Sequence, residues 1–380
     1  MQRKWRTLTK EEYTEAIHDV IYLCACAVNE TIPDRNRTAE MNLEFLYKAA
    51  QKHSLTAAVA YALESVGIKD HAFEQAKAKS IRKITLMEFE KNRLFERLEE
   101  EGIWYAPLKG CIIKDLYPSI GMRQMADYDI LFDKVRQKDM CRIMLSLGFT
   151  CEDFGKGHHD VYYKQPVSNF EMHRGLFSEI HKNEIYQYYS NIKARFLKDD
   201  NNKYGYHFNV HDFYIFLTAH EYKHYVRGGT GLRSLLDTFV IMKKSGHELD
   251  WNYIRTECKK MGIDNFERKS RQLALKLFGD DTLNDDEKEM LNYYIFSGTY
   301  GNQKNELQNN IDQNGGGNKG KLKLIRQKLF MPMAHIKDAY PIVYRHKLLV
   351  PGLFFYRLGK AVTVKRKDTI AKIKMIRKIK

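Results

Sequence analysis

The stretch Met125-Ala-Asp-Tyr-Asp-Ile-Leu-Phe132 decides the fold prediction. Its apolar residues predict a buried β-strand, and side chains along a strand alternate between the two faces of a sheet. Asp127 and Asp129 are two residues apart, so their carboxylates are expected on the same face. Two adjacent carboxylates repel each other and are costly to desolvate, and such a pair usually persists because a cation lies between them. A pair of Mg²⁺ ions held in this way is a standard device for phosphoryl or nucleotidyl transfer.

The segments around this strand predict a small mixed sheet. Residues 103–108 form a β-rich run ahead of it, and residues 160–163 and 168–173 form two more after it. The apolar spacing of residues 134–147 predicts an amphipathic helix between them. Few strands, joined by one helix and by hairpin-like turns, favour an α+β fold over a large doubly wound sheet.

Helical spacing of apolar residues flanks this sheet on both sides, and the chain divides into five predicted regions. One of them is expected to be a flexible linker, because it is rich in Asn, Gln and Gly. The regions are an N-terminal helical region (1–101), an α/β core (102–205), a helical domain (206–300), the linker (301–320) and a basic C-terminal tail (321–380).

The net charge of +15 is concentrated at the C-terminal end. Residues 319–380 carry 18 Lys and Arg against two Asp, whereas the preceding residues carry 45 Lys and Arg against 46 Asp and Glu. The tail therefore predicts contact with an anionic surface, either a membrane or RNA, or else a solvated helix that packs weakly on the body. Its helical character is indicated by isoleucines at every third residue, namely Ile370, Ile373, Ile376 and Ile379. The neutral body argues against a stable DNA complex.

The sequence also predicts a cytoplasmic protein. No apolar run approaches the roughly 20 residues that span a bilayer, and the polar segment that follows Met1 is unlike a secretory signal. The six cysteines are scattered and form no CxxC pair, which indicates reduced thiols and argues against a thiolate zinc site.

Several motifs together resemble a known family. The segment Pro107-Leu-Lys-Gly-Cys-Ile-Ile-Lys-Asp-Leu-Tyr-Pro118, followed by Arg123 and by Asp127-Tyr-Asp-Ile-Leu131, is similar to a group of uncharacterised bacterial nucleotidyltransferases. This group belongs to the superfamily whose best-known member is DNA polymerase beta. A later acid-x-His at Glu171-Met-His173 resembles the same family. So does a His-rich helix followed by Leu-Arg-x-x-x-Asp, here His220, His224, Leu232, Arg233 and Asp237.

The resemblance implies an α+β nucleotidyltransferase core flanked by helical regions, and an enzyme that uses a nucleoside triphosphate (NTP). It implies transfer of a nucleoside monophosphate to a hydroxyl of a small molecule or a protein, with release of pyrophosphate. The catalytic residues, which would also bind Mg²⁺ or Mn²⁺, are then Asp127, Asp129 and Glu171. The nucleotide-binding residues are Lys109, Gly110, Cys111 and Arg123. An acceptor pocket would include His173, His220 and His224.

Two positions depart from the superfamily pattern. Cys111 stands where Ser or Gly is preferred as a donor to a phosphate, and Lys109 stands where a second Gly is common. Gly110 would let the backbone approach the phosphates, because it has no Cβ. The N-terminus of the helix that follows favours an anion.

Two other functions fit parts of the sequence. His220-Glu-Tyr-Lys-His224 matches the His-Glu-x-x-His pattern of zinc metalloproteases, with both imidazoles on one helical face. A core that has lost activity and only binds a partner is the other alternative. Tight stoichiometric zinc would favour the protease, and nucleotide binding that depends on Mg²⁺ or Mn²⁺ would favour the transferase. Absence of any nucleotide binding would favour the binding protein. Arg233 and Asp237 could also be an ordinary i,i+4 salt bridge.

Overall fold

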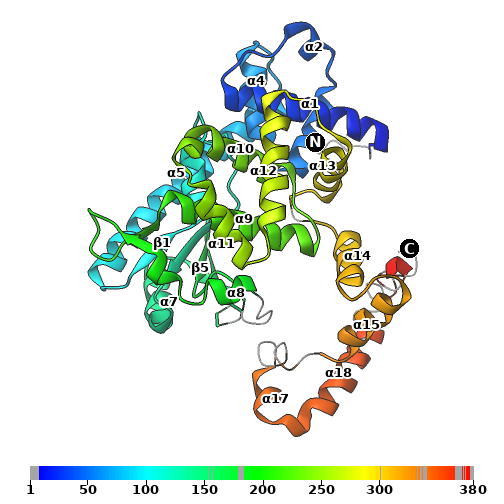
Figure 1. The fold of residues 1–380 in the computed structure, drawn as a ribbon. Coiled ribbons are helices and arrows are strands. Elements are labelled where there is room, and N and C mark those ends of the chain that lie inside the picture. The colour runs from blue at the N-terminus through cyan, green and yellow to red at the C-terminus, as the bar shows by residue number, and fades with distance from the viewer. Residues whose placement is uncertain are drawn as a thin grey trace.

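The computed structural model places a small sheet between two groups of helices, with a helical extension at the C-terminal end (Figure 1). The structure describes residues 8–152, 154–155, 157–178, 184–299, 301–331, 333, 336, 340–363, 370, 372 and 374–376. The arrangement confirms the predicted α+β fold with helical flanks.

The N-terminal region consists of helices with polar caps. Thr9 and Glu12 form a capping box at the start of the first helix, and Asp70 caps the start of the longest one. The five helices are α1 (Lys10–Asn29), α2 (Arg35–Glu40), α3 (Leu43–Lys52), α4 (Thr56–Ser65) and α5 (His71–Glu100).

The central sheet has five strands in the order β1-β2-β5-β4-β3. Strand β2 pairs in parallel with β5, whereas the β1–β2, β5–β4 and β4–β3 pairs are antiparallel, so the sheet is mixed. The strands are β1 (Tyr105–Pro107), β2 (Tyr128–Phe132), β3 (Thr150–Cys151), β4 (His159–Lys164) and β5 (Ser168–His173). A second sheet pairs β6 (Phe196–Lys198) with β7 (Tyr206–Phe208), and α8 (Glu184–Tyr188) precedes it.

Alternation along β2 gives the sheet two different faces. Tyr128, Ile130 and Phe132 join a hydrophobic cluster with Leu94 of α5 and Ile143 of α7 (Gln137–Ser146). The residues between them point to the opposite face, which α5 and α7 leave uncovered. This uncovered face carries the acidic residues.

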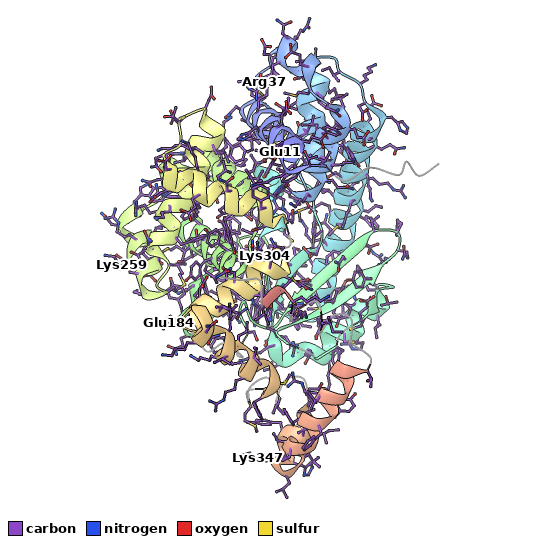
Figure 2. The ribbon with its side chains drawn as sticks, turned by 90° about the vertical axis from the view of Figure 1, so that its right-hand side faces the viewer. Glu11, Arg37, Glu184, Lys259, Lys304 and Lys347 are labelled. Carbon is purple, nitrogen blue, oxygen red and sulfur yellow. The ribbon has the colours of Figure 1, made fainter. Side chains whose placement is uncertain are left out.

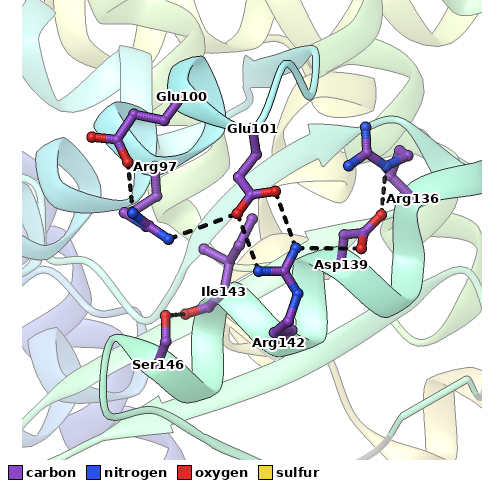
Figure 3. Close-up of polar contacts among 8 residues, drawn as sticks. All are labelled: Arg97, Glu100, Glu101, Arg136, Asp139, Arg142, Ile143 and Ser146. Carbon is purple, nitrogen blue, oxygen red and sulfur yellow. Dashed lines mark hydrogen bonds and ion pairs between the residues drawn. The ribbon is translucent and has the colours of Figure 1, made fainter.

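An ion-pair network at the surface joins the end of α5 to α7 (Figure 3). The Arg142 guanidinium donates to both carboxylate oxygens of Glu101, at 3.1 and 3.0 Å, and Arg97 lies 3.7 Å from the same carboxylate. These side chains are largely solvated, so the network adds little to the hydrophobic packing between the two helices.

The C-terminal helices and the N-terminal helices share one hydrophobic core. Ile17 of α1 and Val59 of α4 belong to the same cluster as Leu236 of α10 and Leu273 of α12. The boundaries at 101, 205 and 300 stay predictions, and the shared core shows that the two helical regions pack together. The helices are α9 (Val210–Arg227), α10 (Leu232–Ser245), α11 (Trp251–Lys260), α12 (Asp264–Gly279) and α13 (Asp285–Ser297).

The segment 301–320 differs from the predicted linker, because it contains α14 (Gln303–Gln313) and the start of α15 (Gly317–Leu329). Asn302 caps α14, and Leu307 and Ile311 are buried one helical turn apart. The polar composition that indicated a linker therefore belongs to the solvated side of a packed helix.

The basic tail continues as α17 (Pro341–Arg345) and α18 (Val350–Val362) and extends away from the body. Figure 2 shows Lys347 in this extension and Arg37 in the N-terminal helices at opposite ends of the molecule. Of the four tail isoleucines, Ile373 and Ile379 lie outside the described residues. Within the described parts of the chain, no helix has the length and apolar character needed to cross a membrane.

Candidate active site

A cavity of about 450 Å³ is lined by residues of helices α9 and α10 and by residues on the face of the sheet opposite α5 and α7. Asp127, Asp129 and Glu171 all line it. Asp129 and Glu171 are paired in register on the parallel strands β2 and β5, so the alternation of both strands turns them to this face. Asp127 lies just ahead of β2. The structure thus brings the three predicted acids to one cavity.

Asp129 is the centre of the polar contacts in this cavity. Its Oδ1 lies 2.7 Å from Nζ of Lys109 and 2.8 Å from Nε2 of His173. His173 Nε2 also lies 3.5 Å from Oε2 of Glu171. Asp129, Glu171 and His173 each place one potential metal-ligand atom within 4.8 Å of the others.

The three carboxylates have different electrostatic environments. Burial alone would raise the pKa of Asp129, but the charge of Lys109 and the hydrogen bond with His173 outweigh it and hold the pKa well below its usual range. Burial would also raise the pKa of Glu171, but the hydrogen bond with His173 and the charges of His159 and His173 together outweigh it, so this pKa is lowered too. Burial and the charges of Asp129 and Glu171 raise the pKa of Asp127 to about 6.

This environment fits a bound divalent cation. Carboxylates from three positions line one cavity, and the charges of Asp129 and Glu171 act together with burial to raise the pKa of Asp127. A divalent ion would relieve that charge, and oxygen-rich donor sets of this kind suit Mg²⁺ and Mn²⁺.

Lys109 has an unusual backbone conformation. Its φ is +46° and its ψ is −118°, a combination that glycine adopts far more readily than lysine and that costs about 1–3 kcal/mol. This explains why the related pattern often has glycine here. The turn points the lysine side chain back over β2 toward Asp129, so Lys109 balances the charge of that carboxylate.

Gly110 is closely approached by neighbouring side chains. A Cβ at this position would lie 2.6 Å from Cε of Met125 and 2.7 Å from Nη1 of Arg123. The helix α6 (Gly110–Ile113) that it begins is only four residues long. The glycine therefore lets the loop before β2 close over the start of α6, a reason the sequence did not indicate.

Cys111 does not lie where the sequence placed it. Its side chain is buried in the cluster on the α5 side of the sheet, and Sγ donates to the backbone carbonyl of Asp129 at 3.5 Å. Burial raises the pKa of this thiol. Among the described residues, Cys111 is not part of the cavity lining, and it packs beneath the site instead of contacting a phosphate.

Arg123 lines the cavity but is held by Asp237 of α10. Nε and Nη2 donate to the two oxygens of the Asp237 carboxylate, both at 2.8 Å, and Nη1 donates to Sδ of Met125 at 2.8 Å. Tyr117 donates to the same carboxylate at 2.7 Å. Arg123 therefore holds α10 against the sheet through its ion pair with Asp237. The sequence had predicted instead that Arg123 binds a phosphate of the nucleotide.

Helix α9 supplies a cationic wall opposite the acids. His220, Lys223, His224 and Arg227 occur at spacings of three and four residues and line the cavity together, with Arg233 of α10 beside them. Burial, together with the charges of Lys109 and Arg227, lowers the pKa of Lys223 to about 8. The sequence prediction included the two histidines but missed Lys223 and Arg227, although a helical period starting at His220 would have found both.

The zinc-protease arrangement is not assembled on α9. His220 Nε2 and His224 Nε2 lie 3.2 Å apart, but Glu221 accepts a hydrogen bond from Tyr294 at 2.7 Å within the helical core. Among the described residues, neither histidine belongs to a group of three side chains close enough to hold a metal ion. The motif is therefore explained without zinc: its glutamate packs in the helical core, and its two histidines line the cavity.

Glu221 gives a pH-dependent prediction. Burial raises its pKa to about 7 from the ordinary 4.5, so between these values the folded state holds a proton that the unfolded state has lost. The free energy of unfolding should then fall by up to about 3 kcal/mol as the pH rises from 4.5 to 7. Glu221→Gln should be more stable than the parent at pH 8 and equal to it at pH 4, as measured by urea unfolding. Equal stability at both pH values would contradict this assignment.

One comparison with known proteins identifies a family. A family described as uncharacterised nucleotidyltransferases matches residues 39–279, which is more than half of the chain and includes every carboxylate of the cavity. Searches of curated proteins and of solved structures gave no match. The chain therefore belongs to this nucleotidyltransferase family.

Proposed function

We propose that the protein transfers a nucleoside monophosphate from an NTP to a hydroxyl group of a small molecule or protein, with Mg²⁺ or Mn²⁺ and with release of pyrophosphate. The observation that carries this proposal is the division of one cavity into two charged walls. The cavity lining combines carboxylates of the sheet with cations of α9 and α10, and Lys223 interacts electrostatically with Asp129 and Glu171. This reaction requires carboxylates that hold the metal ions and cationic side chains that hold the phosphates.

The carboxylate wall would hold the metal ions. Asp127, Asp129 and Glu171 would be their protein ligands, and bound ions would neutralise charge on the phosphates. Lys109 now neutralises Asp129 at 2.7 Å, so its ammonium group would have to move aside or turn toward the triphosphate when a metal binds.

The chemistry is a displacement at the α-phosphorus of the NTP. The acceptor oxygen forms a bond to that phosphorus while the bond to the bridging oxygen breaks, and pyrophosphate leaves with the electron pair. The acceptor proton would pass to the carboxylate of Glu171 and then to solvent. Lys223, Arg227 and Arg233 would hold the phosphates on the opposite wall.

Lys223 predicts a pH-dependent affinity for the nucleotide. Its pKa of about 8 means that the ammonium group is charged at pH 7 and largely neutral at pH 9. We expect the KM for NTP to rise about tenfold over this range, because one charged contact with the phosphates is lost. In Lys223→Met the KM should be high and nearly constant from pH 7 to 9. The exposed Lys259→Met is the matched control and should behave like the parent; the same pH dependence in Lys223→Met would refute the role of Lys223.

The acceptor and the nucleotide are identified by one screen. The full-length protein is incubated with each labelled NTP and Mn²⁺, alone and with a cell extract, and products are examined by mass spectrometry for an added monophosphate. The proposal expects a labelled small molecule or protein and an equal amount of pyrophosphate. No label with any of the four NTPs, despite measured metal-dependent nucleotide binding, would contradict it.

A binding protein without catalysis is the second candidate, favoured by one observation. Nζ of Lys109 lies 2.7 Å from Oδ1 of Asp129, so a side chain of the protein itself can balance the charge of that carboxylate. Absence of nucleotide binding with either Mg²⁺ or Mn²⁺ would favour this alternative.

The location of the protein in the cell and the partner of its basic tail are also proposals. We place it in the cytoplasm, where NTPs are abundant, and all six cysteines are present as thiols. The basic tail 321–380 remains a candidate contact for an anionic membrane or RNA.

A further inference from the structure

Three histidines form a cluster next to the carboxylates. His159 and His173 are paired in register on β4 and β5, and His158 lies just ahead of β4. Their ring centroids are 4.8 Å apart for His158 and His159, 5.0 Å for His159 and His173, and 5.7 Å for His158 and His173. Each ring places one nitrogen within 4.8 Å of the others, and all three line the cavity.

His173 has the hydrogen-bonding pattern of a metal ligand. Its Nε2 contacts the Asp129 carboxylate at 2.8 Å, while its Nδ1 is buried and has no hydrogen-bond partner in the structure. The ring is 2% exposed, so this nitrogen lies away from bulk solvent. Histidine ligands of metals typically donate their second nitrogen to a carboxylate, which orients the ring and makes the other nitrogen a better donor.

His159 repeats part of this pattern. Its Nδ1 is also buried without a hydrogen-bond partner, and its Nε2 lies 3.7 Å from the Glu171 carboxylate. Burying a nitrogen without a hydrogen-bond partner is unfavourable, because the nitrogen loses its contact with water and gains none in return. Two such nitrogens in one cluster of three rings therefore indicate that the cluster binds a ligand.

We propose that His158, His159 and His173 form a second metal site, which takes a divalent transition ion with a preference for imidazole nitrogen, such as Zn²⁺ or Co²⁺. Three nitrogen donors suit these ions and do not suit Mg²⁺, which prefers oxygen. The carboxylates of Asp129 and Glu171 lie next to the rings of His173 and His159, and their negative charge favours a bound cation. Three protein ligands leave one coordination position open toward the cavity. This inference does not depend on nucleotidyl transfer.

The test uses Co²⁺ as a spectroscopic probe of the full-length, metal-depleted protein without nucleotide. We expect visible absorption bands of nitrogen-ligated Co²⁺ that saturate at one equivalent, and competition by Zn²⁺ but not by Mg²⁺. His158→Ala should weaken Co²⁺ binding at least about 100-fold. The exposed His247→Ala, which removes an imidazole far from the cluster, should bind like the parent.

Two outcomes would overturn the proposal. One is the absence of saturable nitrogen-ligated bands in the parent protein. The other is equal Co²⁺ affinity in His158→Ala and His247→Ala. Circular dichroism of each variant is compared with that of the parent to separate loss of binding from loss of folding, and His159→Gln serves as a second variant. Mn²⁺-dependent nucleotide binding should persist in His158→Ala, so failure of this site is distinguishable from failure of the proposed transfer reaction.

Discussion

Asp129→Asn is expected to lower nucleotidyl transfer by at least about 1,000-fold, which corresponds to about 4 kcal/mol of lost transition-state stabilisation. Asp129 is the most buried of the three acids, at 5% exposure, and the one that contacts both Lys109 and His173. An amide is nearly the same size but neutral, so it would bind a divalent ion far more weakly. The measurement is pyrophosphate release at saturating NTP and Mn²⁺.

The control must separate catalysis from folding. Asp139→Asn makes the same chemical change on α7, where Asp139 belongs to the surface network of Figure 3 and lies outside the cavity lining. We expect this variant to retain full activity. Thermal unfolding of both variants shows whether the loss in Asp129→Asn exceeds any loss of folded protein. Undiminished turnover in folded Asp129→Asn would remove the basis for the metal site.

Arg123→Met is expected to lower the free energy of unfolding by about 3–5 kcal/mol, because it leaves the partly buried Asp237 carboxylate without its cation. The Arg123 guanidinium is 8% exposed and makes two hydrogen bonds to that carboxylate. Arg142→Met is the matched control, because Arg142 makes the same paired contact with Glu101 at the surface. We expect the control to change stability very little, since solvent screens that pair. Both are measured by chemical unfolding.

The two possible roles of Arg123 give opposite patterns. A positioning role predicts the loss of stability just described, and Arg123→Met with Asp237→Leu should recover part of it. A phosphate-binding role, as the family resemblance implied, predicts a raised KM for NTP with unchanged stability. A stable Arg123→Met variant with a raised KM would contradict the structural assignment.

The strand geometry of the site was predictable because a strand has a period of two. Once the run ending at Phe132 was recognised as a strand, the common face of Asp127 and Asp129 followed from alternation alone. Glu171 was predicted only from the family resemblance, because its face depends on the in-register pairing of β2 with β5. The apolar residues between them predicted the covered face, and the structure has them packed against α5 and α7.

The other contacts depend on loops and on residues distant in the sequence. Arg123 and Asp237 are 114 residues apart, so no local pattern indicates that they pair. Cys111 lies one residue after the glycine, but the turn at Lys109 rotates it to the far side of the sheet. The helix at 303–313 was missed because most of its residues are solvated. Its buried side chains are Leu307 and Ile311.

The measurement that tests the central claim most directly is the affinity for a non-hydrolysable NTP analogue, measured by calorimetry with Mn²⁺ and with a chelator. The claim is that the carboxylates of the sheet bind divalent ions around the triphosphate. It predicts that Mn²⁺ tightens binding to the parent protein by at least about tenfold, about 1.4 kcal/mol, and that this gain disappears in Asp129→Asn. Equal affinities with and without Mn²⁺ in the parent, or an unchanged gain in Asp129→Asn, would contradict it.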